Sequence, residues 1–308
     1  MADRRGLAGV PEPVRVRVPA KVNLHLAVGQ LQPDGFHDVT TVMQAVSLYD
    51  EVTAHPARVE VECRITGEGA GELPENSDNL AVAAALRLAI RAGIDDGALL
   101  DIVKGIPVAG GMAGGSADAA GALVACEALW RAGLDRDELM ELATTLGADV
   151  PFILTGGTAL ATGRGERVSP VLASGRCHWV FALASKGLST AAVYAEHDRG
   201  APLPEASPDG VLAALRAGDT VALGRALHND LQSAALRLRP SLRRLLDTGL
   251  EHGALGAIVS GSGPTCAFLA RSQGDAVGLA AAISGGGVCR AVRTAYGPVA
   301  GARVVTDT

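Results

Sequence analysis

Lysine is the scarcest charged residue in this 308-residue chain, and other shortages also restrict what the protein does. Of 27 lysines and arginines only three are lysines, which leaves 24 arginines. Aromatic residues make up 3% of the chain, so the base-stacking platforms of single-strand binders are not expected. The formal net charge is −6, whereas a general nucleic-acid binder is usually basic. No apolar run approaches the length of a membrane span, so no transmembrane helix is expected.

The number and spacing of the cysteines and histidines do not fit a disulfide framework, a zinc site or a metalloprotease motif. There is no CxxC pair and the cysteine count is odd, which is typical of reduced thiols in a cytoplasmic protein. No HExxH motif marks a metalloprotease. The first 21 residues lack the apolar stretch of a secretory signal, so a cytoplasmic location is expected. The five cysteines are Cys63, Cys126, Cys177, Cys266 and Cys289.

Periodicity and capping residues predict a chain of mixed helices and strands. Strands are expected at 14–28, with a break at Pro19, and at 39–53, 57–66, 99–106 and 288–295, with a hairpin around GSGP. Ser77 or Asp78 is expected to cap one helix, and Asp135 another, which ends at Gly147. The helices are expected at 79–92, 116–132, from Asp135 to Gly147, and at 208–217, 219–238, 241–252 and 274–284.

A glycine-rich loop directly before a helix is the strongest chemical signal. The stretch KGIPVAGGMAGGSADAA begins at Lys104 and places Gly110, Gly111, Gly114 and Gly115 ahead of a helix start near Ser116. Glycines let backbone N–H groups converge, and a helix N-terminus adds free N–H groups and a positive dipole end. Such a junction favours a phosphate. Its spacing fits neither the Walker A motif nor the dinucleotide fingerprint, and a flexible turn packed against the core is the alternative.

Three motifs in order resemble the GHMP small-molecule kinases. They are PAKVNLHLAVGQLQPDGFHDVTTV at 19–42, PVAGGMAGGSADAA at 107–120 and VSGSGPTCAF at 259–268, and together they span nearly the whole chain. Within this superfamily, PAKVNLHL, PDGFH, SDNL and LGADVPF resemble the 4-diphosphocytidyl-2-C-methyl-D-erythritol kinase family. One departure is Phe36, where the family commonly carries a phenol, so stacking survives but a phenol hydrogen bond does not.

The resemblance implies an α+β fold of two domains. A ribosomal-S5-like, ATP-binding domain would cover residues 1–168 and an α/β sandwich would cover residues 169–308, with the active site in the cleft between them. The implied reaction is ATP-dependent phosphorylation of the 2-hydroxyl of a cytidine diphosphate polyol, in the non-mevalonate pathway to isoprenoid precursors. The implied cofactors are ATP and Mg²⁺. No nucleic-acid or membrane partner is implied, and the protein would be a monomer or a homodimer.

The resemblance also assigns roles to individual residues. Lys21 and Asp149 would be catalytic, and Ser116 would be a magnesium ligand. The ATP site would comprise Asn79, Lys104, Pro107, Val108, Ala109, Gly110, Gly111, Met112, Ala113, Gly114, Gly115 and Ser116. The acceptor site would comprise Asn23, Phe36, His37, Thr190, Tyr194, Gly261, Ser262 and Gly263.

Helix lengths independently place Asp149 near the glycine loop. The helix from Ser116 rises roughly 25 Å and the return helix roughly 16 Å, so an antiparallel pair brings the end of the second helix back toward the loop. A carboxylate there is suited to take a proton from an acceptor hydroxyl, and a lysine beside it favours its ionised form. Lys186 carries no motif and is given no role.

Several alternatives remain open from the residues alone. Lys104 is equally an ordinary exposed lysine, and Asn79 equally a helix-start residue. Gly261 and Gly263 are equally a structural turn, and His37 equally a histidine that only satisfies a loop carbonyl. For the whole chain, the rivals are another GHMP kinase, of the homoserine or mevalonate type, and a non-catalytic member of the superfamily.

Overall fold

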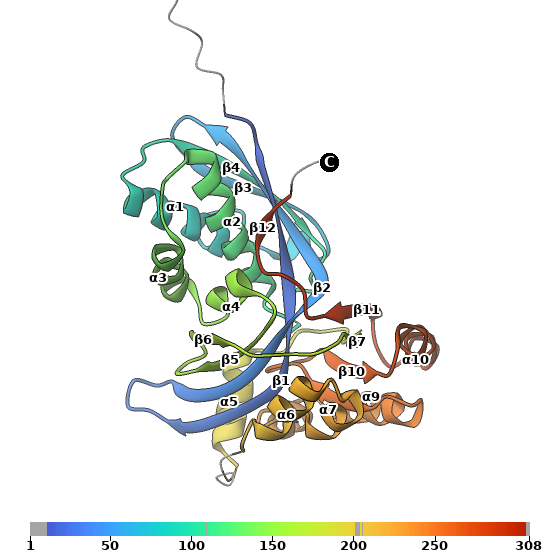
Figure 1. Ribbon diagram of the computed structural model, residues 1–308. Helices are drawn as coiled ribbons and strands as arrows, with labels where there is room; N and C mark the ends of the chain where they lie inside the picture. Colours follow the sequence, from blue (N-terminus) through green and yellow to red (C-terminus); the bar gives the residue numbers. More distant parts are fainter. Residues whose placement is uncertain (1–10, 109, 201–203, 205, 306–308) are drawn as a thin grey trace, which may run out of the picture.

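Two β-sheets, each covered by helices, make up the protein (Figure 1). The computed structural model describes residues 11–108, 110–200, 204 and 206–305. The predicted mixture of helices and sheets is therefore confirmed, and within these residues no helix is long and apolar enough to cross a membrane.

The larger sheet is built around two long antiparallel strands, β1 (Val14–Leu31) and β2 (His37–Ala57), which run the length of the molecule in Figure 1. Its main order is β12-β1-β2-β4-β3, and β5, β6 and β8 attach at its sides. The other strands are β3 (Val61–Gly67), β4 (Gly97–Lys104), β5 (Thr158–Thr162), β6 (Arg167–Pro170), β8 (His228–Asn229) and β12 (Arg303–Val304).

The predicted break at Pro19 is wrong, because β1 continues through this residue. Pro19 pairs with Tyr49 and the next residue, Ala20, pairs with Val46, so the partner strand carries two extra residues at this point. A bulge of this kind accommodates a proline, which has no N–H to give to the ladder. The strand therefore delivers Lys21 and Asn23 to the middle of the sheet.

Four helices follow the first strands in sequence. They are α1 (Leu80–Ala92), α2 (Gly114–Trp130), α3 (Arg136–Leu146) and α4 (Val150–Thr155). Helix α2 lies directly on the sheet, because a Cβ on Gly121 would approach Val52 Cγ2 to 2.7 Å. Asp135 caps α3, as predicted, and forms a capping box with Glu138. Asn79, not Ser77 or Asp78, caps α1, since its side-chain oxygen accepts a hydrogen bond from the Ala81 N–H.

The second sheet has the order β11-β7-β10-β9 and includes the predicted hairpin, which is confirmed. Its strands are β7 (Cys177–Leu183), β9 (Gly256–Val259), β10 (Cys266–Ala270) and β11 (Ala291–Gly297). The accompanying helices are α5 (Thr190–Asp198), α6 (Asp209–Ala217), α7 (Thr220–Ala226), α8 (Gln232–Leu238), α9 (Ser241–Glu251) and α10 (Gln273–Gly285).

Gln44 joins the two sheets at a buried point on β2. Its side-chain oxygen accepts a hydrogen bond from Trp179 Nε1 at 3.0 Å, and its Nε2 donates to Thr158 Oγ1 at 3.2 Å. A buried amide of this kind is stable only when both of its ends are satisfied. The contact fixes how β7 crosses β2.

The single helix predicted over 219–238 is wrong. The chain forms α7, then the short strand β8, then α8. Asn229 causes the interruption, because its Oδ1 accepts from the Leu231 N–H while its Nδ2 donates to the Val259 and Gly261 carbonyls. These bonds replace helical ones, as asparagine side chains commonly do. The sequence also failed to predict α4 and α5.

Candidate active site

The glycine loop follows β4 and ends at α2, as predicted, although α2 begins at Gly114 and not at Ser116. Left-handed backbone angles occur at Gly111 (φ 71°) and Ala113 (φ 63°). Gly115 is exposed at the helix start, where first-turn N–H groups have no helical partner. The loop therefore presents free donors to a cavity. Ala109 lies outside the described residues.

The turn between β9 and β10 packs tightly against this loop. A Cβ on Gly111 would approach the Ser260 carbonyl oxygen to 2.2 Å, so only glycine fits there. The Ser260 hydroxyl donates to the Gly111 carbonyl at 3.1 Å, and the Lys21 N–H donates to the Met112 carbonyl at 3.2 Å. Three segments far apart in the sequence thus hold the loop in one shape.

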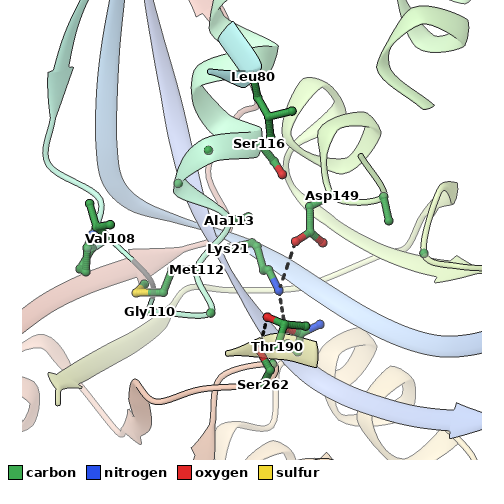
Figure 2. Close-up of a pocket in the computed structure, with 18 of the residues that line it drawn as sticks. Lys21, Leu80, Val108, Gly110, Met112, Ala113, Ser116, Asp149, Thr190 and Ser262 are labelled. Carbon is green, nitrogen blue, oxygen red and sulfur yellow. Dashed lines mark hydrogen bonds and ion pairs between the residues drawn. The ribbon is translucent and has the colours of Figure 1, made fainter. Parts of the chain in front are cut away.

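A cavity of about 590 Å³ opens between these segments, and most of the predicted site residues line it. Figure 2 shows Ser116, Asp149 and Lys21 around one opening, with Thr190 and Ser262 close by. The predicted residues that line it are Lys21, Asn23, Asn79, Lys104, Pro107, Val108, Gly110, Gly111, Met112, Ala113, Gly114, Gly115, Ser116, Asp149, Thr190, Tyr194, Gly261 and Ser262. Phe36, His37 and Gly263 do not line it.

Lys21 and Asp149 lie together, as predicted. Lys21 Nζ is 3.6 Å from Asp149 Oδ2 and donates to Asn23 Oδ1 at 2.7 Å. Asn23 Nδ2 in turn donates to Thr41 Oγ1 at 2.9 Å, which fixes the amide orientation. Lys21 is buried, whereas the Asp149 side chain is 33% exposed. The arrangement is a fixed cation beside a carboxylate that a solute can reach.

Asp149 owes its position to the start of α4. It occupies the N-cap position, but its side chain makes no capping hydrogen bond. Pro151 follows within the first turn, where a proline's missing N–H costs nothing. The carboxylate is therefore directed by the backbone and left available for chemistry.

A pair of hydroxyl groups lies on another side of the cavity. The side-chain oxygens of Thr190 and Ser262 are 2.9 Å apart (Figure 2).

Lys104 is not the free cation that the sequence allowed. Its side chain is 1% exposed, and Nζ donates to Asp50 Oδ2 at 2.5 Å, Asp118 Oδ2 at 2.6 Å and the Gly114 carbonyl at 3.3 Å. Asp50 Oδ1 also accepts from the Gly105 and Ile106 N–H groups. Two carboxyl groups hold the ammonium, so its main contribution is to tie β4, β2 and α2 together beneath the loop.

The buried triad of Lys104, Asp50 and Asp118 retains a carboxyl proton near neutral pH. Burial raises the pKa of Asp118 to about 8, against the opposing attraction of Lys104, and Asp118 Oδ1 has no hydrogen-bond partner among the described residues. Burial would lower the pKa of Lys104, but the two carboxylates together raise it. Near neutral pH the triad is therefore close to electrically neutral, which suits its place under an anion site.

The Asp118 pKa predicts a pH-dependent stability that Asp118→Asn removes. Between the ordinary pKa of 3.8 and about 8, the folded chain holds a proton that the unfolded chain has released, so the stability of the natural chain falls as pH rises. The asparagine variant lacks this loss. Its free energy of unfolding, relative to the natural chain, should rise with pH by up to about 1.4 kcal/mol per unit in this window.

Urea titrations from about pH 5 to about pH 9 measure that difference. The exposed Asp247→Asn serves as the control and should run parallel to the natural chain. A pH-independent difference for Asp118→Asn would contradict the raised pKa.

His37 lines a second cavity, of about 810 Å³, which adjoins the first at Val39. Its Nδ1 carries the hydrogen, because it lies 2.8 Å from the Gly29 carbonyl, which only accepts. Its Nε2 lies 3.2 Å from Asp198 Oδ1 without hydrogen-bond geometry. The ring is 5.3 Å from that of Tyr194, which lines the first cavity. The two cavities therefore share a wall made by these rings.

Phe36 and Tyr194, the two aromatic residues predicted for the acceptor site, have different surroundings. Phe36 is 54% exposed and one of its faces is covered by the Arg164 guanidinium, 4.2 Å from the ring centre. Tyr194 is largely buried, and burial, with Asp149 and Asp198 nearby, raises its pKa to about 12. Tyr194 is thus a neutral ring between the cavities.

Sequence reasoning missed several residues that shape the site. Asp50 lies on β2 outside any motif. Thr41 lies inside the motif at 19–42 but was not singled out, and Asp118 sits inside the glycine motif but resembles a surface helix residue. Asn229 was the most detectable, because the Asn-Asp pair interrupts a predicted helix with two residues that favour turns. Nothing in the sequence distinguishes Arg164 from the other arginines of this chain, which has 24 in all.

Comparison with known proteins agrees with the geometry. The GHMP kinases N terminal domain matches residues 79–157 and the GHMP kinases C terminal domain matches residues 211–288. A 4-diphosphocytidyl-2-C-methyl-D-erythritol kinase of Nocardia farcinica is 56% identical over 97% of this chain and 98% of its own. One from Streptomyces coelicolor is 55% identical over 95% of this chain and 99% of its own.

Solved structures indicate the same family and fold. A crystal structure of 4-(cytidine 5'-diphospho)-2C-methyl-D-erythritol kinase has a TM-score of 0.76 and 32% identity, covering 91% of this chain and 98% of that one. A homoserine kinase from Cytophaga hutchinsonii has a TM-score of 0.74 at 21% identity, covering 97% of this chain and 99% of its own, and shows the shared fold alone. This chain belongs to the 4-diphosphocytidyl-2-C-methyl-D-erythritol kinase family of the GHMP kinases.

Proposed function

We propose that this protein transfers the γ-phosphoryl group of ATP to the 2-hydroxyl of 4-diphosphocytidyl-2-C-methyl-D-erythritol. The observation that carries the proposal is the Lys21–Asp149 pair, with 3.6 Å between its charged atoms, in a cavity that the glycine loop also lines. Phosphoryl transfer is mostly positioning and charge stabilisation, and it needs one group to take the acceptor proton. This cavity offers both functions within one opening.

Asp149 takes the proton of the acceptor hydroxyl. The acceptor oxygen forms its new bond to phosphorus as the bond to the departing diphosphate breaks, so the carboxyl gains one proton and ADP leaves. Lys21 favours the ionised form of Asp149 and stabilises the developing alkoxide. Its own position is fixed by Asn23, so it does not need to reorganise during the reaction.

The glycine loop and the N-terminus of α2 fit the phosphates of ATP. Gly115 is exposed at the helix start, and Gly111 is held by the β9–β10 turn, which leaves the loop's backbone donors facing the cavity. When bound, ATP supplies the phosphoryl group. Asn79 caps α1, and its neighbour Leu80 offers an apolar wall for the base.

Mg²⁺ fits the site as a companion of the phosphates. Among the described residues no group of three or more His, Cys, Asp or Glu side chains is placed to hold a metal ion. Magnesium commonly binds through substrate phosphates with one or two protein ligands. Ser116 would provide such a ligand, and the ion would neutralise phosphate charge.

The second cavity would have no role in the rival activities. A small acceptor such as homoserine or mevalonate would occupy the space beside Asp149, whereas a cytidine diphosphate polyol also extends to the cavity at His37. A non-catalytic role has no need for a paired Lys21 and Asp149. We also propose domains at 1–168 and 169–308, a cytoplasmic location, and a monomer or homodimer without nucleic-acid partners.

An ATP-consumption assay against a panel of acceptors tests the proposal. The panel contains the diphosphocytidyl polyol, the same polyol without the cytidine, homoserine and mevalonate. Turnover with the first alone supports the proposed function. Equal or faster turnover with homoserine or mevalonate overturns it in favour of that rival, and no turnover with any acceptor favours the non-catalytic one.

His37→Ala should weaken recognition of the cytidine end of the acceptor. A neutral imidazole with neighbouring backbone groups can satisfy the polar edge of a cytosine, and leaving that edge without a partner costs roughly 1–3 kcal/mol. The half-saturating acceptor concentration should rise about tenfold or more, while that of ATP stays nearly unchanged. Steady-state kinetics in both substrates measure this split, and equal effects on both would remove His37 from the acceptor site.

A further inference from the structure

The turn between β5 and β6 lies where the two cavities meet. Thr162 and Gly163 line the second cavity, whereas Arg164 and Gly165 line the first. The Val39 N–H donates to the Gly163 carbonyl at 2.6 Å, which ties the turn to β2, two residues from His37. A Cβ on Gly165 would lie 3.6 Å from Ala148 Cβ, next to Asp149. The turn therefore bridges the His37 region and the Asp149 region.

Arg164 is the cation best placed to meet an anion at this junction. Among the described residues that line the two cavities, the lysines and arginines are Lys21, Lys104 and Arg164. Lys21 is engaged beside Asp149, and Lys104 is buried against Asp50 and Asp118. Arg164 alone has a side chain that is about half exposed, at 51%.

The surroundings of Arg164 explain why a cation is needed there. The lining carboxylates include Asp78 and Asp149 in the first cavity and Asp38, Asp198 and Asp230 in the second. An acceptor that spans both cavities carries its diphosphate across the junction, past several of these groups. A guanidinium forms paired, charge-assisted hydrogen bonds with phosphate oxygens. It would offset the repulsion that the acidic walls exert.

The present contacts of Arg164 leave it available for this exchange. Its guanidinium stacks on Phe36, which orients it, and forms an ion pair with Asp34 in which both side chains are half exposed. Exposed ion pairs of this kind contribute little to stability. A doubly charged diphosphate therefore competes effectively with Asp34 while the stacking contact is retained.

We propose that Arg164 binds the diphosphate of the acceptor and thereby determines specificity for a nucleoside diphosphate over a plain nucleoside. This inference rests on the proposed function for the identity of the acceptor. Arg164 does not act on the transferred phosphoryl group, because the reaction takes place at Asp149. Its role is to hold the middle of the acceptor between the base and the reacting hydroxyl.

Direct binding of two probes tests the inference. Titration calorimetry measures the affinity of cytidine 5′-diphosphate and of cytidine for the natural protein, Arg164→Ala and Arg164→Lys. The control is Arg167→Ala, which removes a nearby arginine that lines neither cavity. Arg164→Ala should lose about tenfold in affinity for the diphosphate and little for cytidine, with Arg164→Lys in between and Arg167→Ala unchanged.

Two results would overturn the inference. An unchanged preference for the diphosphate in Arg164→Ala would show that other groups bind it. An equal loss for both probes would show that Arg164 acts only by supporting Phe36. Steady-state kinetics distinguish a failure of this inference from a failure of the proposed function. Arg164→Ala should raise the half-saturating acceptor concentration about tenfold and leave that of ATP unchanged. If the natural protein fails to phosphorylate the acceptor, the proposed function falls, whereas the calorimetry still decides the role of Arg164.

Discussion

Replacing Asp149 with asparagine is expected to lower turnover by a factor of about 100 or more, with little change in folding or in nucleotide binding. The scale is that of losing a general base, and it corresponds to about 2.7 kcal/mol of transition-state free energy. Asparagine keeps the shape of the side chain but cannot accept the acceptor proton. The Asp149 side chain makes no capping hydrogen bond to α4, so its carboxylate charge is not needed to start the helix.

Single-turnover kinetics with saturating ATP and acceptor measure the chemical step for this variant. Nucleotide titration and urea unfolding provide the folding controls. Asp198→Asn is the matched substitution, because Asp198 lies against His37 in the second cavity and away from Lys21. It should alter acceptor binding more than the chemical step. Near-normal turnover by a correctly folded Asp149→Asn protein would exclude proton transfer to this residue.

Lys104→Met is expected to lower the free energy of unfolding by about 3–5 kcal/mol at neutral pH, the scale observed when one partner of a buried ionic group is removed. Methionine fills much of the space but leaves Asp50 and Asp118 buried without their ammonium. The loss should grow above about pH 8, because without the ammonium the pKa of Asp118 rises further and the folded variant keeps a proton that the natural chain releases. Nucleotide binding should weaken as well, since β4 and α2 are no longer tied beneath the loop.

Urea titration of Lys104→Met across the pH range measures this destabilisation. The double variant Lys104→Met/Asp118→Asn removes one of the two buried acidic groups and should recover part of the lost stability, most clearly at high pH. The exposed Lys186→Met controls for loss of a lysine elsewhere. If Lys104→Met is as stable as the natural chain but binds ATP poorly, Lys104 acts on the nucleotide directly and the structural account is wrong.

Local sequence determined the phosphate loop and its neighbours. The spacing of glycines ahead of small helix-forming residues requires a loop-to-helix junction, and the Asp135 capping box fixes where the return helix starts. Because both helices have the same rise per residue, their lengths, an antiparallel pairing and a few extended residues together predicted that Asp149 returns to the loop. The pairing with Lys21 followed from a motif on a strand that the alternation already predicted.

The tertiary structure decided everything that depends on partners distant in the sequence. Lys104 looked like a free nucleotide ligand until β2 placed Asp50 against it, 54 residues away. The helix predicted at 219–238 breaks because Asn229 binds the carbonyls of Val259 and Gly261, about 30 residues further along. Arg164 acquires its place only when the β5–β6 turn meets β2 and the start of α4. Periodicity and capping residues reflect interactions within one helix or strand, so the sequence reveals them. Buried charges and long-range side-chain hydrogen bonds depend on which elements pack together, and the packing of the whole chain decides which elements those are.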